Sequence, residues 1–151
     1  MKQTIKLVVM ATLCLNFCYG QGTNKSYIYA LTAYKSGYKT GYRITDDHFL
    51  RGRAITVRNY TLPQLFALAL KLESIKDNSV KVKDQQQIII DVHQPEKLNK
   101  KYCFKLVVPY DHQDDFYPLM QRTLNKEFPE YLVKIEKRDK NYFMVIRDQE
   151  Y

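Results

Sequence analysis

The clearest hydrophobic pattern in the chain lies in residues 59–73, NYTLPQLFALALKLE, and predicts a buried helix. Thr61 and Gln64 have the spacing of a capping box, in which each side chain binds an orphan backbone N–H of the first turn. Pro63 falls within that turn, where its missing N–H costs nothing. Leucines on further sides widen the apolar stripe, so the helix is expected to be covered on most sides. The predicted core positions of this helix are Leu62, Leu65, Phe66, Ala69 and Leu72.

Shorter patterns before this helix predict strands. Residues 27–34 are rich in β-forming side chains, and residues 53–58 alternate regularly between two faces. Residues 35–47 between them are polar and contain two glycines, so we expect a loop or an irregular hairpin there. The second of these strands leads directly into the helix.

Strand patterns also follow the helix. Residues 80–83 alternate valine with lysine, as in a short edge strand, and residues 87–92 form a more apolar run. Residues 102–108 have the strongest strand pattern of this half of the chain. The alternation of that strand turns Phe104 and Leu106 to the same side, so both are predicted core residues.

A second helix is predicted over residues 114–128, where an aspartate caps the start and a proline follows the end. Its apolar stripe is narrower than that of the first helix, so we expect it to lie over one face of a sheet. Residues 131–137 and 142–146 then predict a hairpin. The predicted core positions of the second helix are Leu119, Met120, Leu124 and Phe128.

These elements predict an α+β fold. We expect one mixed, mostly antiparallel sheet with two helices packed on one face, divided into two rough strand–helix–strand halves. The length of 151 residues suits one domain, which is assigned to residues 27–151 after a polar leader at 21–26.

Residues 1–20 have the pattern of a signal peptide. Lys2 and Lys6 precede an apolar run at 7–15 that is too short to span a membrane, and small residues at Cys18 and Gly20 suit cleavage directly after them. A buried first strand and a lipid anchor are the alternatives, and large residues before both cysteines argue against the anchor. We therefore expect export to the periplasm or beyond the cell, with no membrane span after cleavage.

Cleavage would change the balance of charge and of cysteines. The mature chain would carry 22 basic and 16 acidic residues, a net charge of +6. Cys103 would be its sole cysteine, so no internal disulfide could form. A buried small side chain is the favoured interpretation of Cys103, and a reactive thiol is the alternative.

The sequence offers weak support for catalysis. His48 and His112 lie beside aspartates in polar segments, and with His93 they show none of the usual metal-ligand spacings. Adjacent carboxylates could act as acid and base only if the fold set them across a cleft. We predict no catalytic residue, no metal and no cofactor.

Basic residues are clustered in three places. They occur at 51–58, at 97–105 and at 134–140, and many tyrosines accompany them. Such a composition can indicate nucleic-acid binding. Export and interleaved acidic residues argue against that, and favour an anionic surface or an acidic partner in the envelope.

Two segments resemble a known family. The sequence ITVRNYTLPQLFALAL at 55–70, with the later strand, helix and hairpin up to NYFMVI at 141–146, is similar to an uncharacterised exported bacterial family. That family forms large paralogous sets in soil bacteria and occurs in Bacteroidetes, sometimes beside thioredoxin-like domains. The similarity covers residues 53–147, but LALKL stands where the family has "LAY", and the family's Trp-containing link is missing. It transfers no catalytic residue.

A second resemblance concerns the C-terminal part. Residues 119–146 are similar to the short βαβ-type domains at the N-termini of secretins and outer-membrane receptors, which bind and signal. Taken together, the sequence predicts an exported, non-catalytic envelope domain with a protein partner and no nucleic acid. The alternatives are a redox-associated accessory protein that uses Cys103, and a signalling module of the second kind.

Overall fold

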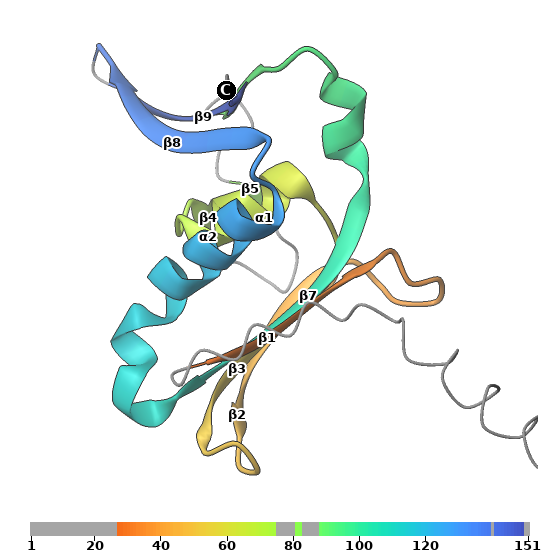
Figure 1. Ribbon diagram of the computed structural model, residues 1–151, viewed down its shortest axis with the longest axis vertical. Coiled ribbons are helices and arrows are strands. Elements are labelled where there is room, and N and C mark those ends of the chain that lie inside the picture. The colour runs from red at the N-terminus through yellow and green to blue at the C-terminus, as the bar shows by residue number, and fades with distance from the viewer. Residues whose placement is uncertain (1–26, 75–80, 83–87, 140, 150–151) are drawn as a thin grey trace, which may run out of the picture.

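The computed structural model describes residues 27–74, 81–82, 88–139 and 141–149 (Figure 1). The helices are α1 (Leu62–Ala69) and α2 (Phe116–Glu127), with two 3-10 segments, η2 (Pro95–Asn99) and η3 (Tyr110–Asp115). The strands are β1 (Ile28–Ala33), β2 (Gly41–Asp47), β3 (Gly52–Thr61), β4 (Glu73–Ser74), β5 (Lys81–Val82), β6 (Ile88–Asp91), β7 (Lys101–Pro109), β8 (Tyr131–Arg138) and β9 (Asn141–Asp148).

The α+β class is confirmed, and the strands divide between sheets. An antiparallel sheet has the order β1-β7-β3-β2, and a second sheet has the order β6-β9-β8, in which β6 runs parallel to β9. Strands β4 and β5 form a separate pair of two residues each. The expected single sheet is therefore corrected for the described residues. Helix α1 lies between the two larger sheets (Figure 1), and it can pack against both because it is apolar on most sides.

Helix α1 begins at the predicted cap. The backbone N–H of Thr61 donates to Oε1 of Gln64 at 2.9 Å, which is half of the capping box. The helix ends earlier than expected, because Lys71 adopts a left-handed conformation with φ 56°. The N–H of Leu72 then bonds to the carbonyl of Ala67, and that of Lys71 to Leu68, as in a Schellman motif.

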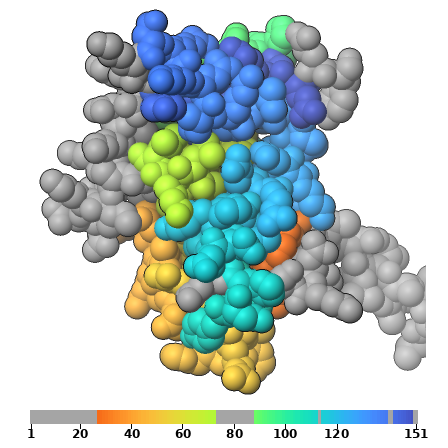
Figure 2. Space-filling model, turned by 90° about the vertical axis from the view of Figure 1, so that its left-hand side faces the viewer, coloured from red at the N-terminus to blue at the C-terminus, as the bar shows by residue number. Residues whose placement is uncertain are grey.

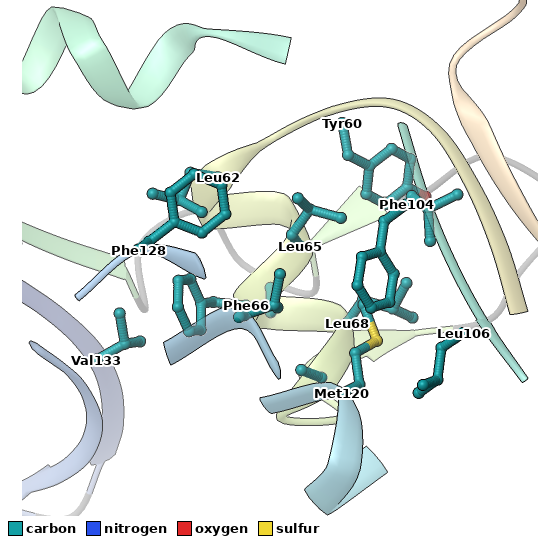
Figure 3. Packing of buried hydrophobic residues seen from close by; sticks show 14 of the residues in the cluster. Tyr60, Leu62, Leu65, Phe66, Leu68, Phe104, Leu106, Met120, Phe128 and Val133 are labelled. Carbon is teal, nitrogen blue, oxygen red and sulfur yellow. The ribbon is translucent and has the colours of Figure 1, made fainter. Parts of the chain in front are cut away.

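The core is continuous from one large sheet through the helices to the other (Figure 3). Leu72 differs from its prediction: it lies beyond the end of α1 and is only partly buried against the core. The predicted core positions did not include Tyr60, Leu98, Met144 and Ile146, which are all fully buried. The predicted core residues that the structure buries are Leu62, Leu65, Phe66, Ala69, Phe104, Leu106, Leu119, Met120, Leu124 and Phe128.

Both helices cover the same face of the four-stranded sheet. Helix α1 follows β3 and α2 follows β7 through η3, and because these strands are antiparallel the helices enter from opposite ends. Helix α2 starts at Phe116 rather than at residue 114, since the preceding residues form η3. Figure 2 shows η3 and α2 on one face of the molecule, below β8.

A hydrogen bond ties α2 to the first strand. The hydroxyl of Tyr29 donates to Oε1 of Glu127 at 2.7 Å. This bond, together with burial, raises the pKa of Tyr29 to about 12, because an ionised phenolate would lose the bond and face a carboxylate. Tyr29 lies on the same face as the core residues of β7, so the bond closes the edge of the helix–sheet interface.

Strand β2 corrects one prediction. Residues 41–47 belong to the polar segment expected to be a loop or an irregular hairpin, but they pair along their whole length with β3. Tyr42 and Ile44 face the core side and are only half-buried. A strand at the edge of a sheet needs few apolar residues, which explains its weak signal.

Across the described residues, no helix has both the length and the apolar character needed to cross a membrane.

A glycine is required where β3 begins. A Cβ atom at Gly52 would lie 2.5 Å from the carbonyl oxygen of Val108 on the neighbouring strand. Replacing Gly52 with alanine is expected to lower the free energy of unfolding by about 1–3 kcal/mol, because β3 and β7 must separate locally. Urea denaturation measures this change. Gly41→Ala is the matched control, since nothing lies within 4 Å of its Cβ position. Equal stability of the two variants would contradict the close approach.

Candidate functional site

The face of the four-stranded sheet turned away from the helices carries polar side chains, and we call it the outer face. Strand registers place Ala30, Lys105, Thr56 and Arg43 in one row across β1, β7, β3 and β2. These positions alternate with core residues along each strand, as the pleat requires. The row is a platform of one aliphatic, one hydroxyl and two cationic side chains.

A β-bulge at Asn59 shapes one end of this platform. The pairing of β3 with β7 shifts register between Val57 and Tyr60, and Asn59 within the shift has φ 55°. Asparagine tolerates this left-handed conformation better than most residues, and bulges redirect nearby side chains. The bulge places the Asn59 side chain under the loop that joins β1 to β2, where only 1% of the residue is exposed.

The Asn59 side chain holds the loop that joins β1 to β2. Its amide nitrogen donates to the carbonyls of Lys35 at 2.9 Å and Tyr38 at 2.8 Å, and its oxygen accepts the N–H of Lys35 at 3.0 Å. Every strong hydrogen-bonding capacity of the buried amide is therefore used. This clamp sets the position of the loop beside the outer face.

The clamped loop forms a wall of the first of two hollows. The Tyr38 ring lies 4.8 Å from the guanidinium carbon of Arg58, a cation–π contact between the loop and β3. The hollow beside them has a volume of about 340 Å³. Its lining comprises Ala30, Thr32, Lys35, Tyr38, Thr56, Val57, Arg58, Cys103, Phe104 and Lys105.

A second hollow adjoins the first and shares Thr56 and Arg58 with it. Its volume is about 400 Å³. The side chains around it come mainly from β2 and the residues just before it. The lining comprises Lys39, Thr40, Gly41, Tyr42, Arg43, Thr45, Thr56 and Arg58.

Positive charge dominates these two hollows. Their linings contain no acidic side chain among the described residues. We call the five cations that surround them the basic groove. The basic groove consists of Lys35, Lys39, Arg43, Arg58 and Lys105.

One carboxylate balances a cation of the groove. Oδ2 of Asp47 lies 3.5 Å from Nζ of Lys105. The backbone N–H of Leu50 donates to Asp47 at 3.0 Å, and this bond, with the nearby lysine, holds the pKa of the Asp47 carboxyl below its usual value. Asp47 is therefore ionised at neutral pH and partly neutralises Lys105. The other four cations of the groove surround space that suits an anion.

Cys103 lies on the outer face and not in the core. Phe104 next to it points toward the helices, so the thiol points the opposite way and is half-buried in the lining of the first hollow. Its Sγ donates to Oδ1 of Asn59 at 3.4 Å. The favoured interpretation of Cys103 as a buried small side chain is thus corrected to a half-buried one.

The three histidines lie in separate places. Nδ1 of His93 lies 2.5 Å from Oδ2 of Asp148, and the two hydrogen bonds from His93 lower the pKa of that carboxyl. Nε2 of His112 lies 3.8 Å from Asp111 within η3, and His48 is exposed in the turn after β2. Within the described part of the chain, no three His, Cys, Asp or Glu side chains form a group that could hold a metal ion.

Three cations on the three-stranded sheet share two carboxylates. Glu136 contacts Arg147 at 2.9 Å, Lys134 at 3.1 Å and Arg138 at 3.2 Å, and Arg147 also contacts Asp91 at 3.3 Å. The bond from Lys134 is the main cause of a lowered pKa of Glu136. Two carboxylates thus balance two of the three positive charges of Lys134, Arg138 and Arg147.

The clusters of basic residues along the sequence did not predict the basic groove. Of its five cations only Arg58 and Lys105 belong to the clusters seen along the chain, while Lys35, Lys39 and Arg43 are scattered through the segment expected to be a loop. The signal that could have found it is the alternation of 41–47, which puts Arg43 opposite Thr56 once β2 is accepted as a strand.

Comparison with protein-family models, with curated proteins and with solved structures found no significant match to this chain. The resemblance of residues 55–70 to the exported bacterial family therefore stays a prediction.

Proposed function

We propose that this protein is an exported, non-catalytic binding domain that docks an envelope protein through the outer face of its four-stranded sheet. The two adjoining hollows of the basic groove carry this proposal. Cations, threonine hydroxyls and an aromatic ring line them, and such groups recognise a ligand by charge and hydrogen bonding. The signal-peptide pattern of residues 1–20 supports export.

The construction of the groove favours a binding role. Its walls are rigidly held, since Asn59 fixes the loop that carries Lys35 and Tyr38. A preorganised surface loses little conformational entropy on association. The redox alternative has less support, because Cys103 donates to Asn59 and thereby takes part in the same structural clamp.

Affinity capture from envelope extract tests this proposal. Replacing Lys35 and Arg58 with glutamate is expected to reduce recovery of the partner about tenfold, because two attractive charges become repulsive. The matched control replaces Arg122 and Lys126 with glutamate, because both are exposed on α2, which covers the opposite face. Recovery should then match that of the unchanged protein. Equal capture by both double variants, or no captured protein, would overturn the proposal.

A further inference from the structure

The partner's chemistry can be inferred from the edge of the outer face. In the part of the chain that the structure describes, β2 pairs with β3 on one side and with no strand on the other. An edge strand presents backbone N–H and carbonyl groups that another extended chain can bind. Gly41 at the start of β2 has open space at its Cβ position, so the outer face is clear beside it.

Charge along β2 is divided between its two ends. Arg43 lies near the start of β2 and lines the second hollow together with Lys39 and Gly41. Asp46 and Asp47 lie at the other end, and Asp47 is already engaged by Leu50 and Lys105. A chain paired with β2 therefore meets positive charge beside the first half of β2. There, the outer-face side chains of the paired chain would reach the second hollow.

Backbone pairing and charge together select one class of ligand. A phosphate or a sulfated glycan could satisfy the cations but not the backbone groups of β2. An extended peptide with carboxylates at alternate positions satisfies both, because alternate side chains of a strand share one face. Arg43 and Arg58 suit carboxylates in particular, since guanidinium binds them in a bidentate manner.

We infer that the segment docked by the proposed binding domain is an acidic peptide strand that pairs with β2 and places its carboxylates in the second hollow. This inference rests on the proposed function and specifies its ligand. The carboxylates contact Arg43 and Arg58, and the backbone extends the four-stranded sheet by one strand.

Synthetic peptides test the inference directly on the purified protein. The probe is a fluorescent peptide of alternating threonine and glutamate, seven residues long to match β2. Three comparison ligands separate the contributions: the same peptide with lysine for glutamate, the glutamate peptide N-methylated at alternate amides, and dextran sulfate. Only the unmodified glutamate peptide should bind well, because it alone combines carboxylates with a backbone able to pair. Arg43→Glu should weaken its binding about tenfold, and Arg122→Glu should leave it unchanged.

Each other outcome overturns the inference in a distinct way. Equal binding of the N-methylated peptide would show that charge acts without strand pairing. Selective binding of dextran sulfate would assign the groove to a sulfated polymer. If no peptide binds while envelope capture still depends on Lys35 and Arg58, the acidic-strand inference fails and the proposed function stands. If that capture also fails, both fail.

Discussion

Replacing Phe66 with alanine is expected to lower the free energy of unfolding by about 3–5 kcal/mol, the usual cost of removing a buried aromatic side chain. Phe66 is 0% exposed and belongs to the cluster that joins both large sheets to the helices. The cavity would open between elements that are fixed on several sides, so little relaxation can fill it. A loss of this size is a large part of the 5–15 kcal/mol that typical domains have in total.

Chemical denaturation of a matched pair measures this effect. Phe49→Ala removes the same side chain from a position that is 93% exposed, and it should change stability by less than about 0.5 kcal/mol. Phe66→Leu keeps most of the volume and should cost less than about 1.5 kcal/mol, so it reports on the site if the alanine variant does not fold. Similar midpoints for Phe66→Ala and Phe49→Ala would refute the position of α1 between the sheets.

Replacing Asn59 with alanine is expected to cost about 2–4 kcal/mol of stability. The change removes the partners of two carbonyls and one N–H in the loop, each worth about 1 kcal/mol when lost. Alanine also tolerates the left-handed φ of 55° less well than asparagine does, which adds to the loss. Water reaches part of the exposed loop, which keeps the total below the sum of these contributions.

Two further variants divide the Asn59 effect into its parts. Asn59→Gly loses the side-chain hydrogen bonds but accepts positive φ, so it should be about 1–2 kcal/mol more stable than the alanine variant. Asn59→Asp keeps the acceptor for Lys35 and loses both donated bonds. Urea denaturation gives the stabilities, and proteolysis between β1 and β2 reports release of the loop. A glycine variant as stable as the original protein would show that the clamp contributes nothing.

The sequence predicted those features whose local signals match the conformation that the backbone adopts. Thr61, Gln64 and the leucine pattern after them predicted the start of α1, its burial and its central place in the fold. The end of α1 was not predictable in the same way, because Lys71 adopts a conformation for which glycine is the usual signal. Burial on most sides was visible in the sequence, but the presence of a sheet on each side was not.

Long-range pairing explains what the sequence did not predict. The parallel pairing of β6 with β9 and the antiparallel pairing of β1 with β7 join residues far apart in the chain, and neither leaves a turn motif. The basic groove depends on such pairing, since its cations come from the loop after β1 and from β2, β3 and β7. The role of Asn59 depends on a bulge that only the register of β3 against β7 reveals.

The central position of β7 has a consequence for synthesis. Strands β1 and β3 do not pair with each other, and each pairs with a side of β7. A nascent chain that ends before residue 101 can form the β2–β3 hairpin. In that chain β1 has no neighbouring strand, and the sheet on which α1 packs is incomplete. High contact order of this kind delays folding until late residues have emerged. The four-stranded sheet therefore cannot be completed until most of the domain has been translated.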